Sequence, residues 1–496
     1  MRKLNKLLLF LLPIVVFFTN FPLITLGETD SMHLEISLPE IWLVLFTITS
    51  LPNLKNLIKF FTLKKLALVS LFPLYAAASI IWSGNHLRAA LTAGLLALIV
   101  FAILNVIYLL VVSDPSAKTA AAKKAALVAQ GTLRHKLLQV FLITSVVVSV
   151  FCWLQCLLDL AGVSRADSLM CAGCTYASFG FPHPNGFTLE PQFMGGLLIA
   201  PALLSFYFAF GDTETKHKRA YFILASFFSA TLFLTFSRGA IYAFAVALVF
   251  LVFSLVFTLK RRTPLLIFPT VIVTSLIVLA AQGIMATLSP TSDNFISGTT
   301  KAIHHLTLGH LDLRPTEPEE SDAVSRATAG EESDAVSQAA VSQETVSVSS
   351  PRQSIYDGYV AESTDTRVNL TNLAIEAAVS DPKILIFGSG LGSAGTTLNE
   401  KFPEKIGTPK QIVQNEYASL LLELGLIGYA ILIITFIKLF RVSNVLILSV
   451  LIGYALTLLF FSGLPNAFHI YLISPLLFGI VSERLTKPTV RRASRK

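Results

Sequence analysis

The sequence has few charged side chains: only 14% of its 496 residues are Asp, Glu, Lys or Arg. A soluble domain carries about 25% charged residues, so this chain has too few to cover a single soluble core. Hydrophobic residues make up 54% of the sequence instead. They gather in continuous runs of about 20 residues, the length that an α-helix needs to cross a bilayer. Because the runs do not alternate with polar residues, they also exclude a membrane β-barrel.

Three further absences narrow the function. The net charge is +8, but the basic residues are scattered among short loops and the C-terminal tail, so no nucleic-acid surface is expected. No Asp-x-Asp pattern suited to a metal ion lies in the segments expected outside the membrane, and we expect neither a metal nor a cofactor. No ionisable residue forms a clear proton-relay pattern within a span, which weakens a proton-coupled transporter, since such proteins usually need one.

We predict an all-α polytopic membrane protein with twelve spans. Their approximate ranges are 7–26, 38–54, 66–82, a fourth span that follows Arg88 and ends near 112, 137–160, 191–210, 220–236, an eighth that ends near 258, 264–288, 416–439, 443–461 and 466–482. Lys and Arg cluster after every second span, which is the positive-inside pattern of membrane topology. We therefore expect the cell (inner or cytoplasmic) membrane, with both termini in the cytoplasm.

The chain divides into four parts. Residues 1–288 hold spans one to nine, 289–412 form a large extracytoplasmic loop, 413–482 hold spans ten to twelve, and 483–496 form a basic cytoplasmic tail. Within the loop, the segment 313–350 contains Glu-Ser-Asp-Ala-Val-Ser twice and almost no aromatic residues. This composition predicts a disordered tandem duplication, because it offers too little apolar surface to bury.

The four cysteines fall into two pairs. Cys152 and Cys156 lie one helical turn apart within the fifth span and are expected to be packing residues. Cys171 and Cys174 form a C-x-x-C pattern in the next outer loop. No second C-x-x-C follows it, so a short-loop disulfide, two free thiols and a metal site remain open for this pair.

Two arginines are placed where charge is costly. Arg238 lies in Leu-Thr-Phe-Ser-Arg-Gly-Ala, between two spans with almost no loop, and Arg367 opens a predicted helix over 366–379. Taken alone, Arg238 could reach toward the headgroups or cap a helix, and Arg367 could form a surface salt bridge. Together they predict a diphosphate site, because a guanidinium binds phosphate oxygens bidentately and stays charged at physiological pH. Such a pair could stabilise a departing lipid diphosphate without a metal.

The segment Phe-Gly-Ser-Gly-Leu-Gly at 387–392 looks at first like a nucleotide-binding loop. It is not part of a β-α-β unit, and it lies on the expected outer side, where nucleotide sugars are absent. A single glycine-rich match is weak evidence. We predict instead a tight backbone turn beside the substrate groove.

In this order and spacing, the motifs resemble those of the O-antigen ligase and polymerase family over roughly 180–440. They are Phe181-Pro-His-Pro-Asn185, Ser237-Arg238-Gly239, Arg367, Asp381-Pro382, Gly388-Ser-Gly-Leu-Gly392, and Asn415 followed by Gly425 and Gly428. The resemblance implies about a dozen helices with a large periplasmic loop. It also implies metal-independent, inverting glycosyl transfer from undecaprenyl diphosphate, which Arg238 and Arg367 would hold.

One position departs from the family pattern. Ligases of the family carry His before the Asn, and here the residue is Gln414, whose amide cannot take a proton near neutral pH. Another base could serve, with Glu416, His183 and Glu190 as candidates. Proton loss could instead come late, or the protein could bind lipid-linked glycans without transferring them. Glu416 could instead have only a structural role, as a carboxylate that stabilises the positive N-terminal end of a helix.

We expect a membrane glycosyltransferase whose partners are an undecaprenyl-diphosphate-linked glycan, a glycan or lipid acceptor, and the bilayer. The expected substrate-binding residues are Arg238, Arg367, His183, Asn185 and Glu190, and the expected catalytic residues are Gln414, Asn415 and Glu416. Without the family's His, a polysaccharide polymerase or a ligase with another acceptor is favoured over a lipid A-core ligase. A polysaccharide exporter or flippase is the alternative, as is an inactive lipid-glycan binding protein. The exporter predicts polar residues through the bundle, which the sequence does not show.

Overall fold

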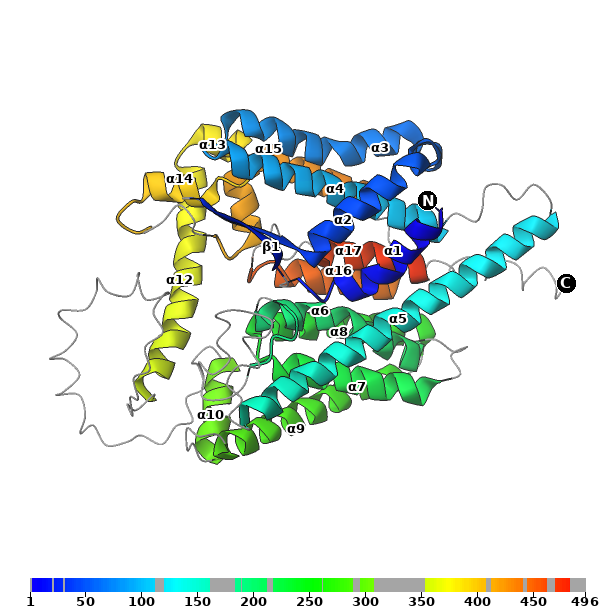
Figure 1. The fold of residues 1–496 in the computed structure, drawn as a ribbon. Helices are drawn as coiled ribbons and strands as arrows, with labels where there is room; N and C mark the ends of the chain where they lie inside the picture. Colours follow the sequence, from blue (N-terminus) through cyan, green and yellow to red (C-terminus); the bar gives the residue numbers. More distant parts are fainter. Residues whose placement is uncertain are drawn as a thin grey trace.

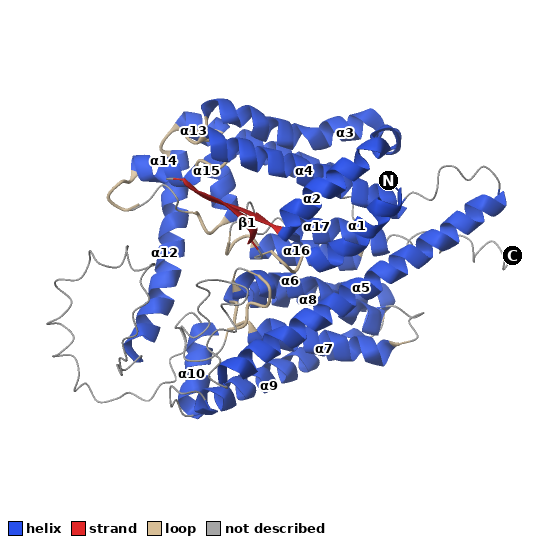
Figure 2. Cartoon of the chain, viewed as in Figure 1, coloured by secondary structure: helices blue, strands red, loops and turns tan. Residues whose placement is uncertain are grey.

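The structure is a computed structural model, and it is built almost entirely of helices (Figures 1 and 2). It describes residues 2–19, 22–29, 32–111, 120–160, 183–188, 190–211, 217–260, 262–288, 295–306, 353–406, 412–439, 444–461 and 469–481. The predicted disordered segment 313–350, Cys171, Cys174 and the basic tail lie outside the described residues.

The elements follow in chain order. They are α1 (Arg2–Val15), β1 (Pro22–Thr29), β2 (Met32–Ser37), α2 (Leu38–Ser50), η1 (Leu51–Asn53), α3 (Leu54–Ala78), η2 (Ser79–Trp82), α4 (His86–Val111), α5 (Ala120–Leu160), α6 (Pro191–Phe206), η4 (Tyr207–Gly211), α7 (Lys218–Leu234), α8 (Arg238–Leu259), η5 (Thr263–Leu266), α9 (Ile267–Leu288), α10 (Phe295–Leu306), α12 (Gln353–Val379), α13 (Pro382–Phe387), α14 (Ala394–Lys401), α15 (Glu416–Leu439), α16 (Val445–Thr457) and α17 (His469–Val481).

The helices have the composition of a multi-pass membrane protein. Within the described part of the chain, seven helical stretches are long and apolar enough to cross a membrane: Leu38–Trp82, His86–Val111, Gly131–Leu158, Pro191–Gly211, Arg238–Leu259, Thr263–Met285 and Glu416–Thr435. Shorter apolar helices occur at Leu4–Val15, Val445–Thr457 and Ile470–Gly479. The all-helical membrane architecture is confirmed in this form, and the count of twelve spans remains a prediction.

The first predicted span, 7–26, is wrong in its second half. Helix α1 ends at Val15, and the chain then forms an antiparallel hairpin of β1 and β2, the one exception to the all-α prediction among the described elements (Figure 2). The strand opens at Pro22, which cannot continue a helix. At the far end of the hairpin, the backbone N–H of Ser37 donates to the Glu40 carboxylate at 2.9 Å and starts α2.

Two Lys-rich segments predicted as loops are helical. Helix α3 begins at Leu54 rather than near 66, with a break at Thr62, where φ is +62°. Helix α5 begins at Ala120 and runs for 41 residues, about 60 Å at 1.5 Å per residue. Ala, Leu and Lys all favour helix, so each helix begins before its apolar span. Hydropathy locates the boundary of the span but not the boundary of the helix. The start of α5 therefore projects well beyond the bundle (Figure 1).

Helix α6 is the centre of the bundle. Of its most apolar window, 89% is buried, compared with 17% for the span that contains α9. It packs against α7, α8 and α16, so α6 is enclosed by protein, whereas most of the α9 span is exposed at the surface of the bundle. Helix α12 crosses one end of the bundle, and the N-terminus lies at the opposite end (Figure 1). We call the α12 end the outer end, following the predicted topology.

The outer end has a small core of its own. Helix α12 packs against α13, α14 and the first half of α15. The apolar residues of this cluster are Leu370, Leu373, Ala374, Ala377, Ala378, Ala394, Leu398, Ile406, Val413, Ala418 and Leu422. Arg367 lies one helical turn before Leu370 on α12, so this cluster fixes the helix that presents Arg367.

Candidate functional site

Arg238 is the first residue of α8 and follows a tight, strained turn. Ser237 caps the helix, its hydroxyl accepting from the backbone N–H of Ala240 at 3.4 Å. Before it, Phe236 has φ +48° and is 2% exposed, a conformation that is rare for a bulky residue. Such strained backbone is often found at functional sites. The backbone N–H groups at the start of α8 add positive potential to the Arg238 guanidinium.

His183 lies against this turn. Its ring is 4% exposed and lies 5.5 Å from the ring of Phe236, and its Nδ1 is 3.3 Å from the carbonyl oxygen of Thr235. A carbonyl only accepts, so Nδ1 carries the proton in this hydrogen bond and Nε2 is the basic nitrogen of the neutral ring. The turn before Arg238 thus sets the tautomer of His183.

The side chain of Asn185 forms hydrogen bonds that stabilise its own loop. Its Nδ2 donates to the carbonyl of Thr188 at 2.8 Å, and its Oδ1 accepts from Gln155 Nε2 of α5 at 3.0 Å. Gln155 also accepts from the backbone N–H of Gly186, whose φ is +60°. Asn185 is 3% exposed. A substrate contact for Asn185 stays a prediction, and its role in this structure is to fix the loop that leads into α6.

Glu190 is the residue that links this loop to Arg367. It precedes α6 as the cap residue and accepts a hydrogen bond from the Gln192 amide. Burial raises the pKa of Glu190 above its ordinary value, while the positive charge of Arg367 and the Gln192 hydrogen bond lower it in part. Glu190, at the start of α6, therefore interacts electrostatically with Arg367 of α12.

The segment 183–190 therefore joins the two predicted arginines. At one end His183 contacts the turn that presents Arg238, and at the other Glu190 interacts with Arg367. The arginines are far apart in the sequence and come from different helices. Arg367 and the turn that precedes Arg238 nevertheless interact with opposite ends of the same short segment.

The start of α15 lies on another side of this region. The Asn415 side-chain oxygen caps the helix by accepting from the backbone N–H of Ala418 at 3.1 Å. The Glu416 N–H donates to the carbonyl of Leu458 at 2.9 Å. Glu416 is 2% exposed, and its carboxylate has a side-chain hydrogen bond with Tyr471 of α17.

Gln414 carries an unused acceptor. Its Oε1 is buried and has no hydrogen-bond partner among the described residues. An unsatisfied buried amide oxygen costs free energy, so the position is suited to accept from a hydroxyl of a bound molecule. Gln414 can therefore accept a hydrogen bond at this position, and that it orients a sugar stays a prediction.

The residues that follow α16 contact both the start of α15 and the turn that presents Arg238. Leu458 accepts from Glu416, whereas a Cβ on Gly239, next to Arg238, would lie 2.6 Å from the Phe460 ring. Phe461 meets the Phe193 ring at the start of α6, with 5.0 Å between centroids. The starts of α6, α8 and α15 therefore gather around residues 458–461. Three helix N-termini at one place give a positive potential that favours an anion.

The glycine-rich segment is a turn, as predicted, with φ of +79°, +100° and +74° at Gly388, Gly390 and Gly392. Its amides point into the protein: the N–H groups of Ser389 and Gly390 donate at 2.8 Å to the carbonyls of Leu422 and Glu423. A nucleotide loop needs those N–H groups for phosphate. In this loop the N–H groups of Ser389 and Gly390 already donate to carbonyls of α15.

Residues 221–433 match the family model described as O-antigen ligase. We call this segment, which is similar to the O-antigen ligase family, the O-antigen ligase domain. No curated protein and no solved structure matches the chain. The match confirms the family that the motifs indicated and supports a general role as an O-antigen ligase or polymerase. The O-antigen ligase domain runs from the first turn of α7 well into α15, and so contains Arg238, Arg367, Gln414, Asn415 and Glu416 but not the 183–190 loop.

Sequence reasoning missed two residues of this region. Glu423 of the O-antigen ligase domain lies inside a predicted span and is 8% exposed. A carboxylate within a span is itself a signal of function, but Glu423 forms no proton-relay pattern that would point to its role. Tyr471 had no signal, because only the fold brings it to Glu416. Among the described residues, no group of three or more His, Cys, Asp or Glu could hold a metal ion.

Proposed function

We propose that the protein transfers a glycan from undecaprenyl diphosphate to an acceptor hydroxyl at the outer boundary of the cell membrane. The observation that carries this proposal concerns the two ends of the 183–190 segment. His183 at one end contacts the turn that precedes Arg238, and Glu190 at the other end interacts electrostatically with Arg367. Two guanidinium groups beside helix N-termini suit a diphosphate. The family match supports the same class of reaction.

In the proposed reaction, an oxygen of the acceptor hydroxyl forms a bond to the anomeric carbon of the donor sugar. The bond between that carbon and the diphosphate oxygen breaks, and its electron pair leaves with the diphosphate. Arg238 and Arg367 stabilise the charge that develops on the departing group. Attack from the face opposite the leaving group inverts the anomeric configuration.

The acceptor proton needs a destination, because Gln414 cannot take it. Of the three candidate bases, His183 has the best-suited geometry, since the Thr235 carbonyl fixes its proton on Nδ1 and leaves Nε2 as the base. Glu190 interacts with Arg367, and the Glu416 carboxylate has a hydrogen bond with Tyr471. Gln414 and Asn415 then orient sugar hydroxyls, Gln414 through its unused Oε1.

The test is reconstitution in liposomes with a synthetic undecaprenyl-diphosphate oligosaccharide. A longer glycan or a new conjugate, with release of undecaprenyl diphosphate, supports the proposal. Arg238→Ala and Arg367→Ala should each lower kcat/KM by about a hundredfold or more. Arg262→Ala removes the same charge at an exposed position at the start of η5 and should have no effect.

Two outcomes would overturn the proposal. Full activity in both arginine variants would exclude the diphosphate site. Movement of the oligosaccharide across the liposome membrane without bond exchange would identify an exporter instead. His183→Gln tests the base: its kcat should fall while donor binding is kept, and the low-pH limb of the rate profile should disappear.

A further inference from the structure

Helix α15 is broken inside its apolar stretch. At Gly425 the backbone has φ +61° and ψ −170°, outside the helical region. A break leaves carbonyls of the preceding turn without their helical partners, and in a bilayer each one needs a replacement. The glycine loop supplies them, since Ser389 and Gly390 donate at 2.8 Å to the carbonyls of Leu422 and Glu423.

The side chain of Glu423 enters the same loop. Its Oε1 accepts from the backbone N–H of Ala394, the first residue of α14, at 3.1 Å, and its carboxylate also accepts from the backbone N–H of Gly392. Arg88 attracts it as well. Each of these neighbours is a hydrogen-bond donor or a cation, which is the surrounding that a carboxylate needs.

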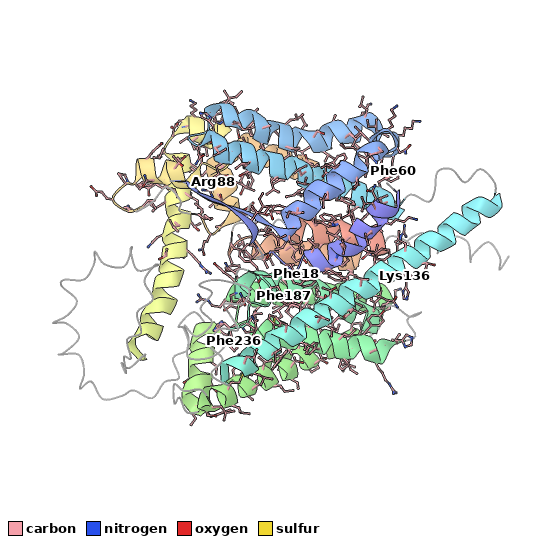
Figure 3. All side chains as sticks on the ribbon, in the orientation of Figure 1. Phe18, Phe60, Arg88, Lys136, Phe187 and Phe236 are labelled. Carbon is pink, nitrogen blue, oxygen red and sulfur yellow. The ribbon has the colours of Figure 1, made fainter. Side chains whose placement is uncertain are left out.

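A glycine turn followed by a helix N-terminus is a common backbone site for anions. Here the group that occupies such a site is part of the chain, because the Glu423 carboxyl group accepts from the backbone N–H groups of Gly392 and Ala394. We call these backbone groups, with Arg88, the glycine nest. Arg88 comes from the first turn of α4, where its own N–H donates to the Asn85 side chain at 3.1 Å, and it lies beside α14 (Figure 3).

The glycine nest connects the outer helices to the start of α15. Leu370 and Ala374 of α12 share one apolar cluster with Ala418 of α15. Arg367 lies one turn before Leu370, and Asn415 one turn before Ala418. The spacing between the predicted diphosphate contact and the predicted sugar contact therefore depends on how α12–α14 dock on this half of α15.

We propose that Glu423 is a positioning residue: by filling the glycine nest, it docks α12–α14 on the first half of α15 and so sets the place of Arg367. This inference rests on the proposed function, since it assigns Arg367 to the lipid diphosphate. Glu423 itself contacts neither the donor nor the acceptor.

The experiment combines two measurements on full-length protein in lipid nanodiscs. Hydrogen–deuterium exchange of residues 389–394 reports on the glycine nest, and the Kd for undecaprenyl diphosphate reports on Arg367 without requiring turnover. In Glu423→Ala the amides of Gly392 and Ala394 should exchange faster, and the Kd should rise roughly ten- to hundredfold, since small displacements at a remote position have effects of this size. Glu400→Ala, on the exposed side of α14, should change neither measurement.

Rescue of Glu423→Ala by added formate is the decisive measurement. The Ala variant leaves a vacant nest that a small carboxylate fits, so formate, but not chloride at equal ionic strength, should restore both slow exchange and the wild-type Kd. Glu423→Gln keeps the shape of the side chain and guards against misfolding; it should weaken binding without responding to formate. Faster exchange with an unchanged Kd would overturn the positioning role, as would any failure of formate to restore the Kd of a folded Ala variant.

The two proposals fail differently. If the wild-type protein binds undecaprenyl diphosphate and formate rescues Glu423→Ala, but no glycan is transferred, the enzymatic function falls and the role of Glu423 stands. If the wild-type protein does not bind the lipid, both fall.

Discussion

The break in α15 depends on a residue without a side chain, so Gly425→Ala should be strongly destabilising. With φ +61° and ψ −170°, Gly425 occupies a region that is essentially restricted to glycine, at a cost of about 1–3 kcal/mol for other residues. A Cβ there would lie 2.5 Å from the Ile386 carbonyl oxygen and 2.6 Å from the Gly388 nitrogen. Overpacking of this kind costs about 1–3 kcal/mol more.

The restriction of the unfolded chain by alanine opposes these two costs. Alanine restricts the unfolded chain and so returns about 0.4–1 kcal/mol. The net loss in the free energy of unfolding is therefore about 1–6 kcal/mol. The matched control is Gly94→Ala in α4, where a Cβ would meet nothing within 4 Å. There alanine improves an exposed helical position and should stabilise by about 0.5–1 kcal/mol.

The assay is thermal denaturation of purified protein in detergent, followed by the fraction that remains monodisperse on size exclusion after heating. Gly425→Ala should melt below the wild-type protein and Gly94→Ala at or above it. If the two variants melt at the same temperature, α15 has no break that requires glycine, and the glycine loop does not compensate such a break.

Three other changes test parts of the site. Burial raises the pKa of Glu190 in the folded protein above the ordinary carboxyl value. The stabilisation from protonated Glu190 is therefore complete below the ordinary carboxyl pKa and is lost as the pH rises through the raised pKa. Glu190→Gln should remove this pH dependence of the melting temperature. If ionised Glu190 competes with the diphosphate for Arg367, the same variant should also lower the donor KM at high pH, and an unchanged KM would exclude such competition. Asn185→Ala leaves buried partners unsatisfied and should cost about 1–3 kcal/mol, whereas Asn369→Ala, exposed on α12, should cost almost nothing in the same melt. Ser237→Ala removes a helix cap and should cost about 0.5–2 kcal/mol, which Ser237→Thr should largely recover.

The starts of the central helices could be predicted from the sequence. Helix α15 begins at Glu416 and ends at Leu439, as predicted, because a capping Asn precedes a long apolar run. The start of α6 after Glu190 follows from Pro191 in the same way. In both places the local sequence contains the whole signal, so no knowledge of distant contacts was needed.

The groups that satisfy the break in α15 could not be predicted. Glu423 takes its partners from α4, the glycine loop and α14, and Arg88 is hundreds of residues away in the sequence. The hairpin at 22–37 was missed for another reason: its apolar residues continued the run of the first span, so hydropathy alone could not show where α1 ends.

The break at Gly425 also changes where this protein should be divided. By sequence, the loop and the last spans meet near residue 413, at the membrane surface. By its contacts, the first half of α15 is attached to α12–α14, through an apolar cluster and the hydrogen bond from Ala394 to Glu423. The second half contacts α3, where Thr435 donates to the Leu68 carbonyl at 3.3 Å. A chimera that exchanges outer segments between related proteins should therefore be joined at Gly425. A junction at 413 would separate Glu423 from the amides it binds.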